Sequence, residues 1–470
     1  VQTSEGAAFV FFGSAAGINT TATVLESNQA NAQMGRSVAS AGDVNGDGYS
    51  DVIAGANAYN NGQTGEGGAF VYHGSASGIS TTAASLLEYN QASAGMGRSV
   101  ACAGDVNGDG YSDVIVGAHL YDGGQGNEGA IFIYHGSASG LSASYNAIAE
   151  SNNTNANLGY CVSSAGDVNA DGYSDVIAGA IQYSNGNLGE GAFFVYHGSA
   201  SGISTTPAAI VEGNQTSAVM GISVASAGDV NGDGYSDVIA GARDYFNGEL
   251  DEGRAYVYHG SATGINTTAN SIIENNQASA FLGFSVCSAG DVNGDGFSDV
   301  AVGAVNHDNG ELNEGAVFIY HGSAAGINIT AAAMLENNLA SAGFGFAVSC
   351  AGDVNGDGYS DLLVGSTGYQ NGQFLEGAFF LYYGAASGIN TTAAFMAESN
   401  QAGANFGYAV ACAGDVNGDG YSDVIVSGYQ YSNGEAGEGV GFIYYGAASG
   451  ISGPASAMLE SNQASAVLTS

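Results

Sequence analysis

The chain has 470 residues, of which 44 are Asp or Glu and 4 are Lys or Arg, so its formal net charge at pH 7 is −40. This acidity excludes nucleic acid and anionic lipid surfaces as favoured partners, because both repel a strongly negative protein. No apolar run is long enough to cross a bilayer and no signal peptide pattern is present, so we expect no membrane insertion.

The first predicted elements are two strands within residues 1–33. Residues 7–12 read Ala-Ala-Phe-Val-Phe-Phe, an apolar run rich in aromatic residues of high β propensity. A second short strand ends at Glu26. Both strands precede the first complete copy of the repeat described next, so we expect them to form an extra strand pair.

Residues 34–95 form the first complete unit, and its pattern predicts four strands. Strand one covers residues 35–41, strand two 51–56, strand three 68–73 and strand four 85–88. These stretches are short, small or β-branched, and Gly-rich turns separate them. No stretch has the composition and 3.6-residue period of a helix.

The unit recurs with a period of 62 residues, which indicates a repeat architecture. Short strands at even spacing predict an all-β fold, a seven-bladed β-propeller of four-stranded blades. A parallel β-solenoid is the alternative, although its repeats are usually much shorter. We expect one domain over residues 1–470, with the extra strand pair at 1–33 and repeats at 34–95, 96–157, 158–219, 220–281, 282–343, 344–405 and 406–470.

Each repeat carries an acidic, glycine-rich loop between strands one and two. In the first copy Asp43, Asn45, Asp47 and Asp51 place side-chain oxygens at loop positions 1, 3, 5 and 9, and the Tyr49 carbonyl serves position 7. An all-oxygen, flexible shell with three carboxylates suits Ca²⁺ better than Mg²⁺ or a transition metal. A solvated turn without metal is the alternative, and seven intact copies argue against it.

The loop differs from an EF-hand in two respects. An EF-hand needs a bidentate Glu at position 12, where this chain has Ala54, and it needs flanking helices, where this chain has strand-like segments. The calcium loop is therefore predicted to belong to a β fold.

Together these motifs resemble the FG-GAP repeat, the blade of the integrin α-subunit propeller. The "FG" half is literal at Phe344-Gly345 and Phe406-Gly407, and the "GAP" half occurs as Gly-Ala, for example Gly55-Ala56, without the proline. The last two copies depart further, to Gly365-Ser366 and Ser427-Gly428. The resemblance covers nearly the whole chain and implies one Ca²⁺ between the first two strands of each blade. It does not imply integrin function.

We expect about seven Ca²⁺ ions, which would bring the formal charge from −40 to about −26. Loop three has Ala170 where the other loops have Gly, so it should bind most weakly. The predicted ligands are Asp43, Asn45, Asp47, Tyr49, Asp51, Asp105, Asn107, Asp109, Tyr111, Asp113, Asp167, Asn169, Asp171, Tyr173, Asp175, Asp229, Asn231, Asp233, Tyr235, Asp237, Asp291, Asn293, Asp295, Phe297, Asp299, Asp353, Asn355, Asp357, Tyr359, Asp361, Asp415, Asn417, Asp419, Tyr421 and Asp423.

The chain holds one more outer half-blade than it has metal loops. The Glu that opens strand three and the Glu that closes strand four each occur eight times, against seven loops. Either residues 1–33 or residues 434–470 can complete the seventh blade, so one pair of strands is surplus. An unpaired strand edge is a template for pairing. Strand exchange between molecules would give a filament. The alternative is a self-packed terminus.

Other residues that recur once per repeat are further candidate sites. Five His, once per repeat from His73 on, lie on different blades and cannot share an ion, so we interpret them as structural. The once-per-blade Glu residues single out no blade for catalysis, and we expect no enzyme activity. The five Cys fit buried small side chains. Tyr49, Tyr59 and their equivalents fit interblade packing, with sugar stacking as the alternative.

We therefore expect a non-catalytic, calcium-binding glycoprotein with a structural or adhesive role outside the cell, where calcium is millimolar. The partners expected are further copies of itself, in filaments joined by strand exchange, or an extracellular protein or glycan. The alternative function is a multivalent carbohydrate-binding adhesion module. The glycosylation expectation depends on Asn-x-Ser/Thr triplets, which an Asn/Thr-rich turn also produces by chance; they begin at Asn19, Asn152, Asn214, Asn266, Asn328 and Asn390.

Overall fold

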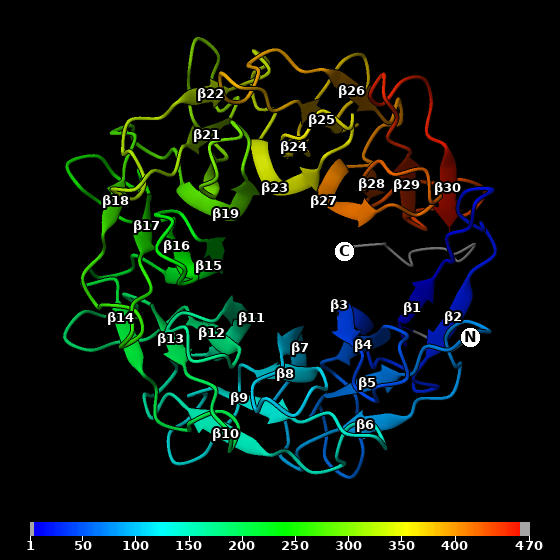
Figure 1. Ribbon diagram of the computed structural model, residues 1–470, viewed down its shortest axis with the longest axis vertical. Helices are drawn as coiled ribbons and strands as arrows, with labels where there is room; N and C mark the ends of the chain where they lie inside the picture. The colour runs from blue at the N-terminus through cyan, green and yellow to red at the C-terminus, as the bar shows by residue number, and fades with distance from the viewer. Residues whose placement is uncertain (1–3, 461–470) are drawn as a thin grey trace.

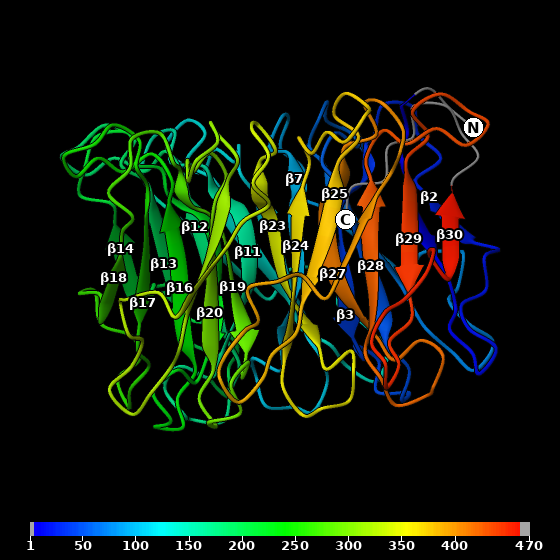
Figure 2. The same cartoon turned by 90° about the horizontal axis from the view of Figure 1, so that it is seen from above.

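A computed structural model of the chain describes residues 4–460. This part contains 30 strands and no helix, and therefore no helix able to cross a membrane. The strands form seven four-stranded antiparallel sheets and one two-stranded sheet. Figure 1 shows the sheets arranged around a central opening, and Figure 2 shows them standing side by side in a single layer. The predicted seven-bladed propeller is confirmed.

Blades are numbered in chain order from the sheet β3–β6. In each blade the strand order in the sheet follows the sequence, and strand one lies nearest the central opening (Figure 1). The observed bounds lie within one or two residues of the predicted ones. The strands of blades one to three are β3 (Met34–Gly42), β4 (Asp51–Ala56), β5 (Gly68–Tyr72), β6 (Ser85–Leu87), β7 (Met96–Gly104), β8 (Asp113–Ala118), β9 (Ala130–Tyr134), β10 (Ala147–Glu150), β11 (Leu158–Gly166), β12 (Asp175–Ala180), β13 (Ala192–Tyr196) and β14 (Ala209–Glu212).

The remaining blades repeat this order. Their strands are β15 (Met220–Gly228), β16 (Asp237–Ala242), β17 (Arg254–Tyr258), β18 (Ser271–Ile273), β19 (Leu282–Gly290), β20 (Asp299–Ala304), β21 (Ala316–Tyr320), β22 (Ala333–Leu335), β23 (Phe344–Gly352), β24 (Asp361–Ser366), β25 (Ala378–Tyr382), β26 (Phe395–Glu398), β27 (Phe406–Gly414), β28 (Asp423–Gly428), β29 (Val440–Tyr444) and β30 (Ala457–Glu460).

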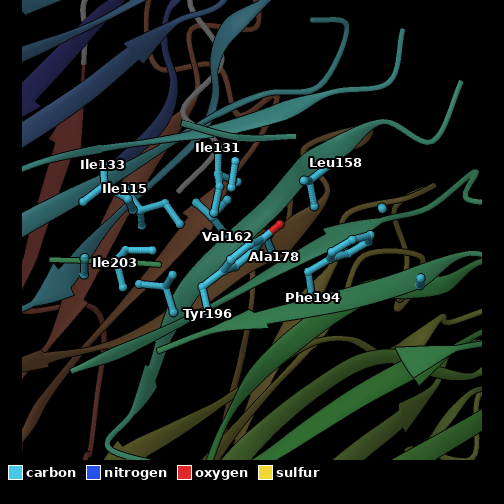
Figure 3. Close-up of a cluster of buried hydrophobic side chains, with 14 of the residues drawn as sticks. Ile115, Ile131, Ile133, Leu158, Val162, Ala178, Phe194, Tyr196 and Ile203 are labelled. Carbon is cyan, nitrogen blue, oxygen red and sulfur yellow. The ribbon is translucent and has the colours of Figure 1, made fainter. Parts of the chain in front are cut away.

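The core lies between blades, because strands two and three are covered on both faces. In β9 and β13, for example, every residue is buried. Figure 3 shows one such layer, in which Ile115 and Ile133 of blade two meet Tyr196 and Ile203 of blade three. The continuous apolar runs of these strands follow from this burial on two faces, since neither face is left for polar side chains.

Glycines allow neighbouring blades to approach closely. Strand one bulges after its first residue, and Gly97 in that bulge has φ of 82°. A Cβ on Gly55 of strand two would lie 2.1 Å from the Gly97 carbonyl oxygen of the next blade. No side chain fits there. The glycines of the "FG" and "GAP" halves therefore face each other across each interface between complete blades.

The C-terminal strands complete blade seven, and the N-terminal pair is the surplus one. Strands β29 and β30 pair with β28, whereas β1 (Ala7–Val10) and β2 (Thr23–Glu26) form the separate two-stranded sheet. Figure 1 shows this pair between blade seven and blade one, where it takes part of an eighth place in the ring. The predicted surplus half-blade is confirmed.

A side chain at the end of strand three contacts the following blade at every interface. Among complete blades this residue is His or Tyr, and it lies against a turn glycine, as His73 does against Gly140. Tyr445 of blade seven makes the same contact with Gly17 of the N-terminal pair, and Phe12 of that pair makes it with Gly78 of blade one. The N-terminal pair thus occupies its place as a regular member of the ring.

Candidate metal loops

Each acidic loop is held by hydrogen bonds between its own residues. In loop one, Asp43 Oδ1 accepts the N–H groups of Gly46 at 2.7 Å and Asp47 at 3.1 Å, and Asp43 Oδ2 accepts that of Gly48 at 2.8 Å. Asp47 Oδ1 accepts the Tyr49 N–H at 3.0 Å. These bonds curl the loop around its alternate side chains, as the spacing predicted.

The position-9 aspartate is the fully buried acid of the loop. Asp113 is fully buried, and its carboxylate accepts the N–H groups of Val106 and Gly136, each at 2.8 Å. It therefore joins the loop, the start of strand two and the turn after strand three. The equivalent residues, all fully buried, are Asp51, Asp113, Asp175, Asp237, Asp299, Asp361 and Asp423.

Burial raises the pKa of this carboxyl group. For Asp113 the pKa rises to about 7, first because of desolvation, which the two backbone hydrogen bonds only partly offset. The carboxylates of Asp109 and Asp105 add to the rise. A cation in the loop would supply the missing positive charge, because an opposite charge nearby favours the ionised form.

The donor atoms of the loop fit Ca²⁺. A carboxylate has about four lone-pair sites. Asp43 uses three of them on N–H groups, and Asp51 uses two, on Val44 and Gly74. Both retain capacity for a cation. The residues that would hold the ion are those at positions 1, 3, 5, 7 and 9.

The carboxylates are not gathered into a formed metal centre. Within residues 4–460, no three His, Cys, Asp or Glu side chains lie close enough together to hold an ion as a group. The acids of positions 1 and 9 are turned toward backbone N–H groups instead, and Asp47 Oδ2 accepts the amide of Asn45 at 3.1 Å. The structure thus places the predicted ligands on one loop in each blade, and their role as ligands stays a prediction.

Loop three differs from the others at the predicted residue. Ala170 has φ of 54°, a left-handed conformation that favours glycine. In the described structure its N–H does not make the bond to the position-1 carboxylate that glycine makes in the other six loops, as at Gly108 (2.6 Å to Asp105). At Gly108 a Cβ would lie 2.6 Å from the ring of Tyr173 in the next blade. The alanine therefore lacks the loop hydrogen bond, and at the equivalent position of blade two the interface leaves no room for a Cβ.

Comparison with known sequences connects these loops to a family. The model of the FG-GAP repeat matches residues 34–72, 97–134, 220–258, 282–320, 344–374 and 406–444, each of which contains one loop. The chain is an FG-GAP repeat propeller. The six matches omit the third repeat, the one that carries Ala170.

Curated relatives of this FG-GAP propeller include integrin α subunits. Integrin alpha-V of Gallus gallus is 31% identical over 244 residues, which are 50% of this chain and 22% of the relative. Integrin alpha-3 of Cricetulus griseus is 33% identical over 214 residues, 44% of this chain and 19% of the relative. The chain therefore spans about a fifth of the length of these relatives.

Solved structures with the same fold have unrelated sequences. Sqt1 of Saccharomyces cerevisiae superposes with a TM-score of 0.52 at 10% identity, over 87% of this chain and 81% of that one. The C-terminal WD40 domain of Sif2 gives 0.50 at 12% identity, over 98% and 90%. At such identities the likeness shows the propeller fold alone.

Most members of both predicted aromatic series pack within the FG-GAP propeller, although Tyr49 is exposed. The position-7 ring covers the loop glycine of the preceding blade, as Tyr111 covers Gly46. The Tyr59 ring lies edge-on to Phe70 of its own blade, with centroids 5.1 Å apart. These contacts agree with packing rather than with open sugar platforms.

The recurring glutamates and the cysteines also have positions that fit structural roles. The strand-three Glu is buried and accepts loop N–H groups, as Glu190 does from Asn185 at 2.6 Å. In blade four Arg254 forms an ion pair with Glu274. The cysteines are unpaired, as predicted. Four of them are half-buried and Cys412 is exposed, so the prediction of burial was wrong for Cys412.

One set of residues that breaks the repeat symmetry was missed. The third residue of strand one is Arg36, Arg98, Tyr160, Ile222, Phe284, Phe346 and Tyr408 in successive blades. The Phe284 and Phe346 rings lie 5.3 Å apart, and Phe346 and Tyr408 5.1 Å apart. A hollow of about 570 Å³ beside them is lined by Arg243 and Asp244 among others. The sequence did contain a sign of this site, because the third residue of strand one varies while the rest of the repeat is similar from blade to blade.

The Ala170→Gly variant tests the weakness of loop three. Calorimetric titration of the native protein should show six similar sites and a weaker one, and the variant should show seven similar sites. Relief of the left-handed alanine is worth about 1 kcal/mol, roughly fivefold in affinity. Gly108→Ala is the matched control and should weaken loop two similarly. Seven equal sites in the native protein would contradict the prediction.

The raised pKa of the position-9 acids predicts proton competition. Because the folded pKa of Asp113 is about 7, above its unfolded value, the Ca²⁺-free protein should lose stability as pH rises through 7. Ca²⁺ needs the ionised acid, so its affinity should fall between about pH 8 and about pH 6.5. Titrations at both values measure this change. Burial lowers the pKa of His135, so protonation of that histidine adds little in this window. An affinity that does not change with pH would refute the competition.

Proposed function

We propose that this FG-GAP propeller is a non-catalytic, calcium-binding module that acts outside the cell in adhesion or as a structural element. The observation that carries the proposal is the sevenfold occurrence of one loop with the same oxygen donors and the same buried aspartate. Similarity to integrin α subunits supports an adhesive role. The absence of catalysis is proposed because the recurring acids are spread one set per blade.

Calcium would act on the ring as a whole. Each interface between complete blades joins two loops through backbone, as when the Ser112 N–H donates to the Asp43 carbonyl oxygen at 3.0 Å. An ion that rigidifies one loop therefore also fixes the edge of the next blade. Seven divalent ions would also relieve part of the repulsion within a chain of formal charge −40.

The expected partners are an extracellular protein or further copies of the propeller. For self-assembly by strand exchange, β1 and β2 would have to leave the ring and give up the bond from the Ile18 N–H to the Tyr445 hydroxyl, 2.6 Å long. The closed arrangement therefore favours single rings over filaments. Electron microscopy in millimolar Ca²⁺ distinguishes the two.

Carbohydrate binding is the second candidate function. The aromatic residues that favour it are not the predicted tyrosine series but rings on the innermost strands. Most of the tyrosine series is packed, whereas the rings of Phe284, Phe346 and Tyr408 follow one another on neighbouring innermost strands, and Phe284 and Phe346 line a hollow. Aromatic faces of this kind stack on sugars. A glycan array with a Phe346→Ala control would test for one site on this side of the ring rather than one per blade.

Removal of calcium tests the proposed function. Chelation should lower the melting temperature strongly, because ligands that bind only the native state stabilise it by mass action. Asp229→Asn should reduce the number of bound ions from seven to six by equilibrium dialysis. Asp308→Asn, an acid outside the loops, is the control and should leave seven. An unchanged melting curve on chelation would show that the loops are not filled.

A further inference from the structure

The loop between strands two and three brings two glutamates together in the outer part of blade two (Figure 1). Glu128 opens strand three, and Glu150 closes strand four. A Cβ added to Gly123 of this loop would lie 2.7 Å from Glu128 Oε1 and 2.6 Å from Glu150 Oε2. The two carboxylates therefore lie close to each other beside Gly123.

The carboxylate of Glu128 is fully buried, and only one of its oxygens has partners. Glu128 Oε1 accepts three N–H groups of the loop, whereas Glu128 Oε2 has no hydrogen-bond partner among the described residues. Glu150 Oε1 accepts the Tyr121 hydroxyl at 3.1 Å, and the described structure gives Glu150 Oε2 no donor. A buried carboxylate oxygen without a partner is costly, so it indicates a bound group that supplies one.

Blade two lacks the amide that serves the strand-four glutamate in other blades. In the other six blades the residue at the position of Gly123 is asparagine, and its Nδ2 donates to that glutamate, as Asn309 does to Glu336 at 2.6 Å. These asparagines are Asn61, Asn185, Asn247, Asn309, Asn371 and Asn433. Gly123 has no side chain, so it cannot donate to Glu150 in this way.

Blade four supplies a positive charge of its own at the equivalent place. Arg254 is buried and forms an ion pair with Glu274, the equivalent of Glu150. Blade two has Ala130 at the position of this arginine. Within residues 4–460 no arginine forms an ion pair with Glu128 or Glu150. The same carboxylate environment thus takes a cation from the chain in blade four, and the chain supplies none in blade two.

We propose that Glu128 and Glu150 hold a Ca²⁺ ion at the opposite end of strand two from the acidic loop. Their carboxylate oxygens are hard donors that suit this ion, and their two negative charges match its two positive ones. Loop residues 122–127 are exposed, so water can complete the coordination shell. The atoms that would bind the ion are Glu128 Oε2 and Glu150 Oε2, neither of which has a donor among the described residues.

This ion would be additional to the seven expected in the acidic loops. Because it has fewer protein ligands than an acidic loop, it should bind more weakly, with a dissociation constant of about 1 mM. It therefore adds one to the number of ions counted at lower Ca²⁺. The site goes beyond the proposed function, since it uses none of the loop residues.

The test compares the number of Ca²⁺ ions bound by the full chain and by its Gly123→Asn variant. The variant restores the amide of the other blades, so it should fold, with a melting temperature no lower than that of the native protein. Equilibrium dialysis at several millimolar Ca²⁺ should count one ion fewer in the variant. Crystals of the native protein soaked in Sr²⁺ should show an anomalous peak beside Glu128 and Glu150, and crystals of the variant should not.

Glu212→Gln in blade three is the matched control, because Asn185 already donates to Glu212 at 2.8 Å. In that blade Asn187 also donates to Glu190 Oε2 at 3.2 Å, so both carboxylates have partners and the count should not change. Equal counts in the native protein and Gly123→Asn would overturn the proposal, since water or a shared proton would then serve the pair. Loss of an ion in the control would overturn it too. The difference of one does not depend on whether the acidic loops are filled, so this result is separate from that of the calcium proposal.

Discussion

The buried aspartate at the end of each loop is the constraint on which the propeller depends. Its carboxylate takes one N–H from the loop and one from the turn after strand three, as Asp113 does from Val106 and Gly136. One side chain thereby connects three segments of a blade. The same burial places seven carboxylates out of water in a chain with four arginines, so protein cations cannot balance them. The hydrogen bonds that join the segments of a blade and the proposed dependence on a metal ion both follow from the burial of this aspartate.

Strand positions were predictable because every repeat carries the same pattern of strands, acidic loop and turns. The 62-residue period, the loop acids and the glycine turns gave strand two as residues 51–56, which are the bounds of β4. The surplus half-blade followed from counting motifs. Which strands were surplus did not follow, because residues 1–33 and 434–470 carry the same outer-strand pattern. Only the geometry of the ring distinguishes them.

The site was predictable to the level of residue identity and not of arrangement. The spacing predicted one loop per blade with its five ligand positions, and it predicted the exception at Ala170. It could not predict that Asp113 would be fully buried while Asp105 is half-buried and Asp109 is exposed, because burial depends on the neighbouring blade. It likewise missed Phe284 and Phe346, whose rings meet only because successive innermost strands stand side by side.

The contact between the end of strand three and the next turn glycine has a consequence for the geometry of the whole molecule. Because it occurs between all neighbours, from Phe12 on Gly78 round to Tyr445 on Gly17, the angular step between adjacent blades is one-eighth of a turn rather than one-seventh. The geometry of a single interface between two neighbours thus determines the number of places in the ring. A chain with one repeat fewer would have to open every such contact to close its circle, so the local fit of two blades decides the circumference.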